Sequence, residues 1–212
     1  MLKLFLFIGL IGAIIMFCGD MILYYTPEDF DYDSGKNQNI MQAVVDVMKK
    51  LPEKRVAIGG MIGPIAAFLY CIGFYHIVAI TDDEWKIIAY VAFFALCLGI
   101  ISGGAYHSHC AYLGLIGDEK YSDAREIVIK YFSKLAFVMY IGEGIGFLLL
   151  IVLIITNNTI LPQWMFLLSP GVLFLLKKPF RRLPRGIRVI VSGGWTNLIS
   201  VIYYIAALIN IL

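Results

Sequence analysis

Charged side chains are scarce in this sequence. Asp, Glu, Lys and Arg make up 15% of the 212 residues, whereas they make up about a quarter of a soluble domain. A chain that is 60% hydrophobic has too few polar groups to cover its surface in water, so it requires a lipid environment. The net charge is only +2, which argues against a nucleic-acid partner.

The sequence also lacks the short motifs that identify common catalytic sites. It contains no phosphate-binding loop, nucleophile elbow, haem motif or dinucleotide fingerprint. The cysteines lie within apolar segments, with neither a disulfide framework nor the spacing of a zinc site, so we expect small buried apolar residues. They are Cys18, Cys71, Cys97 and Cys110. These absences leave any reaction and any cofactor unknown.

Long apolar runs, in contrast, occur along the whole chain. A helix needs about 20 apolar residues to cross the hydrocarbon core of a bilayer. Six segments meet or approach this length, which predicts an all-α integral membrane protein with one domain, residues 1–212, built as a bundle of six transmembrane helices. The expected spans are residues 2–25, 56–80, 85–116, 135–156, 160–176 and 187–212. The fifth is the shortest and contains Ser169-Pro170-Gly171.

The distribution of Lys and Arg predicts the orientation of these spans. All basic residues except Lys3 and Lys86 lie in or beside the loops after the first, third and fifth spans. Because Lys and Arg accumulate in cytoplasmic loops, we expect both termini outside and these three loops in the cytoplasm. Residues 40–51 and 124–132 of the first two loops carry apolar side chains at helical spacing, which predicts short helices on the membrane interface. Membrane lipids are the expected partners.

Strongly polar side chains inside the spans are few, and each is a candidate functional group because it is costly in a bilayer. Asp20, His107, Glu143 and Asn197 come from four different spans, and the predicted orientation places all four in the cytoplasmic half. Their similar depth predicts that they meet in one pocket. His109 lies two residues from His107, about 200° around a regular helix, so the two cannot bind one metal ion unless the helix is broken.

Small residues indicate the faces on which the spans pack. Gly99, Gly103 and His107 recur at i, i+4 spacing, which predicts that His107 points into the bundle. His76 lies near the outer end of the second span, away from the predicted pocket. Four tyrosines are expected to line that pocket: Tyr24, Tyr70, Tyr106 and Tyr204.

Three segments carry a resemblance to other proteins. They are CGDMILYY at 18–25, GGAYHSHCAY at 103–112 and GGWTN at 193–197. Together they resemble an uncharacterised family of bacterial multi-pass membrane proteins. The resemblance implies a location in the bacterial cytoplasmic (inner) membrane, and it implies no activity, substrate or catalytic residue. The chain does not resemble the membrane-embedded metal hydrolases that use a His-x-x-x-His pair, because it contains no such pair.

Three functions are open at this point. In the first, the protein binds or transports a small molecule or lipid, and Asp20, Glu143 and the histidines bind its polar head or relay protons. In the second, it is a lipid hydrolase or transferase in which Asp20, His107 and Glu143 ligate a metal ion, with His109 or Asn197 in support. In the third, it is a non-catalytic subunit whose polar groups hold helices together. We place binding or transport first. The sequence does not indicate the oligomeric state.

Overall fold

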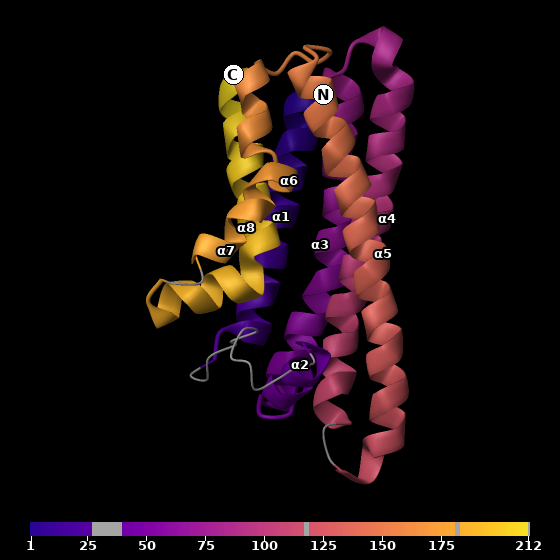
Figure 1. Ribbon diagram of the computed structural model, residues 1–212, viewed down its shortest axis with the longest axis vertical. Helices are drawn as coiled ribbons and strands as arrows, with labels where there is room; N and C mark the ends of the chain where they lie inside the picture. The colour runs from indigo at the N-terminus through magenta and orange to yellow at the C-terminus, as the bar shows by residue number, and fades with distance from the viewer. Residues whose placement is uncertain (27–39, 117–118, 181–182, 212) are drawn as a thin grey trace.

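The computed structural model describes residues 1–26, 40–116, 119–180 and 183–211, which form helices joined by short connections (Figure 1). The long helices are α1 (Leu2–Tyr24), α3 (Glu53–Ile80), α4 (Lys86–Leu115), α5 (Ser122–Ile155) and α8 (Arg185–Ile211). The short ones are α2 (Ile40–Met48), α6 (Pro170–Leu173), α7 (Lys177–Phe180), and the 3-10 helices η1 (Asp83–Trp85), η2 (Glu119–Tyr121), η3 (Gln163–Leu168) and η4 (Phe174–Leu176). These ranges contain no β-strand, only an isolated bridge between Thr81 and Thr159. The all-helical prediction is confirmed.

Five helices in the described ranges are long and apolar enough to cross a membrane. They are α1, α3, α4, α5 and the part of α8 from Gly193 to Ile211. Each buries one stripe of its surface against the bundle and leaves large apolar side chains exposed on other faces. Phe68 is 66% exposed and Phe94 is 63% exposed. An apolar outer surface of this extent is unfavourable in water and favourable in hydrocarbon, as expected of an integral membrane protein.

The predicted fifth span is not a single spanning helix, so the count of six spans is not confirmed. Residues 163–180 form the short segments η3, α6, η4 and α7. Ser169 interrupts them with extended backbone, at φ −57° and ψ 137°, because the residue before a proline is disfavoured in the helical region. Its hydroxyl oxygen accepts a hydrogen bond from the Gly171 backbone N–H at 3.2 Å and so caps α6. The segment nevertheless carries the chain from the upper end of the bundle to about the middle of its long axis, where α7 lies (Figure 1).

Neither amphipathic stretch is confirmed as an interfacial helix. The second is the beginning of α5, which starts at Ser122 rather than near residue 135 because no helix-breaking residue separates the stretch from the apolar run. The first does form a helix, α2, but its apolar face packs inside the protein. Val44, Val45 and Met48 are buried in one cluster with residues of α4 and α5, including Leu113 and Phe132.

The helices pack in a ring. α1 contacts α3 and α8, α3 contacts α4, and α4 contacts α5, while η3 and α6 contact both α5 and α8 and so close the ring. The two chain ends lie at the same end of the long axis, as do the α3–α4 and α5–η3 connections (Figure 1). Those two connections are joined by the Thr81–Thr159 bridge. Of the basic residues that predict the orientation, Lys36, Arg181 and Arg182 lie outside the described residues.

The interior holds two main apolar clusters at different heights. The larger one includes Leu6, Tyr70, Leu96 and Leu150. The other includes Leu23, Tyr24, Cys110 and Phe132, at the end where α2 lies. The buried polar side chains described next extend between these two clusters.

Candidate functional site

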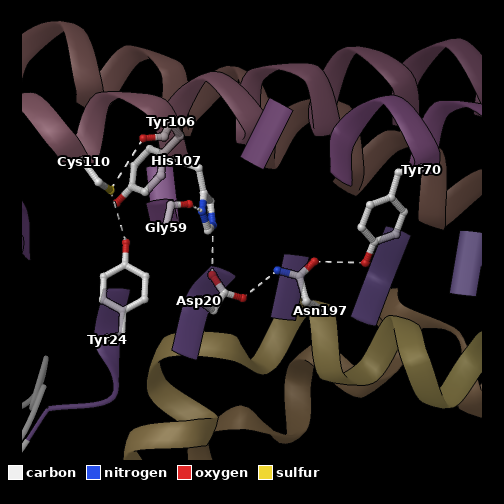
Figure 2. Close-up of polar contacts among 8 residues, drawn as sticks. All are labelled: Asp20, Tyr24, Gly59, Tyr70, Tyr106, His107, Cys110 and Asn197. Carbon is white, nitrogen blue, oxygen red and sulfur yellow. Dashed lines mark hydrogen bonds and ion pairs between the residues drawn. The ribbon is translucent and has the colours of Figure 1, made fainter. Parts of the chain in front are cut away.

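A contact between a histidine of α4 and an aspartic acid of α1 lies at the centre of the buried polar residues. His107 Nε2 is 3.0 Å from Asp20 Oδ1, and the two side chains are 8% and 6% exposed (Figure 2). An isolated charge at such a position is strongly unfavourable, so the two groups depend on each other. The structure therefore brings together the two residues that sequence reasoning placed at the same depth on the first and third spans.

A glycine of α3 makes room for this pair. The Cβ atom of an alanine at Gly63 would overlap the His107 Cβ atom and would lie 2.9 Å from the Gly104 carbonyl oxygen. Gly63 therefore lets α3 and α4 approach with their backbones nearly in contact, as small residues do in membrane helices. His107 Nδ1 then lies 3.5 Å from the Gly59 carbonyl oxygen, one turn away on α3.

Two further residues extend the pair to α8 and back to α3. Asn197 donates a hydrogen bond from Nδ2 to Asp20 Oδ2 at 2.7 Å. Tyr70 donates from its hydroxyl group to Asn197 Oδ1 at 3.0 Å. Figure 2 shows these four side chains linked in series, with His107 above Asp20 and with Asn197 and Tyr70 following to the right. We call His107, Asp20, Asn197 and Tyr70 the polar chain; it connects α4, α1, α8 and α3.

The direction of these hydrogen bonds determines where protons reside. Asp20 Oδ2 accepts from Asn197, so a proton on this carboxyl group can lie only on Oδ1, facing His107 Nε2. On the other side of the ring, the Gly59 carbonyl oxygen can only accept. A neutral imidazole has one N–H, so both ring nitrogens are satisfied when His107 is doubly protonated or when Asp20 carries the proton. In either form, one transferable proton lies between Oδ1 and Nε2.

Arg55 supports the end of α1 next to the polar chain. Its Nε atom donates to the Ile22 carbonyl oxygen at 2.6 Å, and Nη2 donates to the Tyr25 carbonyl oxygen at 2.7 Å. The last carbonyl groups of a helix have no partners within the helix, and a cation at this end is favourable to the helix dipole. Sequence reasoning counted Arg55 only as a topology signal. No side-chain pattern in the sequence pointed to this role, because both acceptors are backbone carbonyl groups.

Glu143 does not join the polar chain. It is buried on α5 against Gly99, where an added Cβ atom would lie 3.0 Å from Glu143 Cγ. Gly99 precedes His107 by eight residues, which is about 12 Å along α4. Each step of four residues also turns the helix by about 40°, so Gly99 faces α5 while His107 faces α3 and α1. Within the described ranges, the Glu143 carboxyl group makes no hydrogen bond or ion pair.

The other predicted site residues lie around the polar chain or away from it. His109 Nδ1 donates a hydrogen bond to the Ala105 carbonyl oxygen on its own helix at 2.6 Å. The Tyr24 hydroxyl group is 3.8 Å from Cys110 Sγ, and the Tyr106 ring stacks on Phe132 at 3.8 Å between centroids. Tyr204 is buried near Gly9 and Gly73, where its hydroxyl group has no partner in the described part of the chain.

A second buried histidine forms a separate contact. His76 Nδ1 lies 2.7 Å from the Gly73 carbonyl oxygen, and Nε2 lies 3.0 Å from the Tyr203 hydroxyl group. Sequence reasoning set His76 apart from the pocket but did not find Tyr203 as its partner, because the two residues are 127 positions apart in the chain.

The donor groups do not fit a metal centre. Among the described residues, no group of three or more His, Cys, Asp or Glu side chains could hold a metal ion. The candidate set of Asp20, His107 and Glu143 is divided between two sides of α4, as described above.

Taken together, the fold and this site define an all-helical protein with several helices able to cross a membrane and a buried polar chain that connects four of them. The chain belongs to a family of unknown function, DUF6796, whose model matches residues 1–212. This confirms the resemblance to an uncharacterised family. No curated protein and no solved structure gives a significant match.

Proposed function

We propose that the protein crosses a bacterial cytoplasmic membrane six times, with both termini outside. The sixth crossing is the broken segment 163–180. Two observations support this: both termini lie at one end of the bundle, and Met165, Ser169 and Pro170 are buried between α5 and α8. Non-helical backbone at membrane depth is tolerated when it is enclosed by protein.

This topology is testable with reporters fused at two positions expected on opposite sides of the membrane. A C-terminal fusion to a phosphatase that is active only outside the cytoplasm is expected to be active, and the same fusion after Lys120 is expected to be inactive. An inactive C-terminal fusion, together with a fluorescent cytoplasmic reporter at that position, overturns the six-crossing arrangement.

We propose that the function is binding or transport of a small molecule or lipid, linked to protonation of the polar chain. The observation that carries this proposal is the buried Asp20–His107 pair at 3.0 Å, a distance at which a proton can pass between the two groups inside the helix bundle. Carboxylate and histidine side chains inside membranes are typical of proton relays. The broken segment beside α8 is a second feature typical of transport proteins.

The polar chain gives a physical route from proton to conformation. Adding or removing the proton between Oδ1 and Nε2 changes the attraction between α1 and α4. Asn197 and Tyr70 transmit that change to α8 and α3, because each bonds to the next member of the chain. Four helices are thus restrained by one titratable pair, and a bound molecule that favours one protonation state shifts the arrangement of all four.

Proton movement in liposomes tests this function. The purified protein is reconstituted with a pH-sensitive dye inside, and a pH gradient is imposed with a potassium-selective ionophore present to balance charge. The intact protein is expected to carry protons, and Asp20→Asn and His107→Gln are expected to reduce the rate at least tenfold. Glu126→Gln is the matched control, because Glu126 is an exposed acid paired with Lys130 at 2.6 Å. No proton movement with the intact protein, or an unchanged rate in Asp20→Asn, overturns the proposal.

The two alternatives have less support. A metal-dependent hydrolase needs the three-ligand group that the described residues do not provide. A purely structural role remains consistent with the polar chain, and it predicts that Asp20→Asn changes stability without changing any proton movement.

A further inference from the structure

Cys71 on α3 and Cys97 on α4 face each other across a close helix crossing. The register of the two antiparallel helices is fixed by contacts on either side of them. The rings of Tyr75 and Phe93 pack at 5.7 Å between centroids, one turn beyond the cysteines. On the other side, an added Cβ atom at Gly104 would lie 2.8 Å from the Ala67 Cβ atom. Residue numbers therefore fall on α4 as they rise on α3, and Cys71 is opposite Cys97.

The two thiol groups are also close enough to affect each other electrostatically. A disulfide requires Cα atoms about 4.4–6.8 Å apart, which ordinary helix packing rarely provides. About two turns from the cysteines the two backbones do approach closely, because an added Cβ atom at Gly104 would lie 3.1 Å from the Gly63 carbonyl oxygen. Both cysteines are partly exposed on the outer surface, so an oxidant dissolved in the bilayer can reach them.

We propose that Cys71 and Cys97 form a reversible disulfide that joins α3 to α4, a redox modification site within the membrane bundle. Oxidation forms one S–S bond and breaks two S–H bonds. The two protons and two electrons pass to an oxidant of the quinone class, which becomes a quinol, and a thiol reductant reverses the step.

The position of this pair gives the disulfide a structural consequence. Cys97 precedes His107 by ten residues, about 15 Å along α4, on the helix pair that holds the His107 ring against Gly59 and Gly63. Joining α3 to α4 at Cys71 and Cys97 therefore limits how far these helices can separate at the polar chain. The other two cysteines are placed differently: Cys18 is exposed on α1, and Cys110 is buried next to Tyr24.

Peptide mapping of the oxidised protein tests this inference. Intact protein in liposomes is treated with a short-chain quinone or with diamide, alkylated to block free thiols, and digested. The expected product is one crosslinked peptide pair containing Cys71 and Cys97, lighter than the separate peptides by two hydrogen atoms and lost on reduction. The Cys18→Ser/Cys110→Ser double variant retains Cys71 and Cys97, and oxidation is expected to consume both of these thiols. The Cys71→Ser/Cys97→Ser double variant retains Cys18 and Cys110, and both of these are expected to stay free after oxidation.

Three outcomes overturn the inference: Cys71 and Cys97 remain free after oxidation, they crosslink only between separate chains, or they crosslink with Cys18 or Cys110. The mapping uses the unmodified chain, so it does not depend on the folding of any variant. It also involves no proton movement, so its failure is distinct from failure of the proposed function.

Discussion

The His107 imidazole and the Asp20 carboxyl group meet at 3.0 Å although 87 positions separate them in the chain. Asp20 lies near the end of α1, and His107 lies in the last third of α4. The contact exists because α3, lying between these two helices in the sequence, packs closely against both. Asn197 and Tyr70 then complete the set of partners, so that both Asp20 oxygens are bonded.

The glycine at position 63 is predicted to be essential for this contact. Gly63→Ala places a Cβ atom on that of His107 and is expected to cost about 1–3 kcal/mol of stability through overpacking. Gly144→Ala is the matched control, because an added Cβ atom there has no neighbour within 4 Å, and it is expected to be neutral or slightly stabilising. Thermal unfolding of both variants in detergent micelles measures the difference. Equal effects of the two substitutions contradict the close α3–α4 packing.

Two buried tyrosines are predicted to respond in opposite ways to loss of the hydroxyl group. Tyr70→Phe leaves Asn197 Oδ1 without its donor and is expected to cost about 1–3 kcal/mol. Tyr204→Phe removes a hydroxyl group that has no partner among the described residues, so it is expected to leave stability unchanged or raised. Both rings are almost fully buried, so their apolar contacts are preserved. Chemical denaturation compares the two, and a larger loss in Tyr204→Phe would reverse this assignment.

Loss of the Arg55 side-chain contacts is predicted to loosen the end of α1. Arg55→Gln removes the hydrogen bonds to the Ile22 and Tyr25 carbonyl oxygens. Amide hydrogen exchange in the last turn of α1 is therefore expected to accelerate, with little change in the first turns. Lys54→Gln, one position earlier on α3, is the control and is expected to leave exchange unchanged. Identical exchange in Arg55→Gln and the intact protein contradicts the capping role.

Most helices were predictable from the sequence because apolar runs of membrane-spanning length are a strong signal. The ends of α1, α3, α4 and α8 fall within a few residues of the expected spans. The start of α5 was missed by over ten residues, because the amphipathic stretch before it continues the same helix. The segment after residue 160 was apolar enough to suggest a span, but Ser169-Pro170 breaks it.

The candidate site was predictable in part. Asp20, His107 and Asn197 were expected at similar depth on different spans, and the structure joins them by hydrogen bonds. Tyr70, expected in the same pocket, donates to Asn197. The placement of Glu143 could not be predicted, for two physical reasons. First, its depth was counted from residue 135, whereas α5 starts at Ser122. Second, residues at i, i+4 spacing turn gradually around a helix, so Gly99, which contacts Glu143, does not face the same helices as His107. Arg55 was missed because its acceptors are backbone carbonyl groups that no sequence pattern reveals.

The most direct test of the account is a double-mutant cycle on Asp20 and His107, measured as the free energy of unfolding in micelles. His107→Gln removes the imidazole partner of the buried Asp20 carboxyl group and is expected to cost about 3–5 kcal/mol. Asp20→Asn is expected to cost less. The double variant is expected to lose less stability than the sum of the two single losses, because neither ionisable group remains. The exposed Glu126–Lys130 pair serves as the control, with small additive effects. Simple additivity at Asp20 and His107 contradicts the claim that these two residues act as one unit.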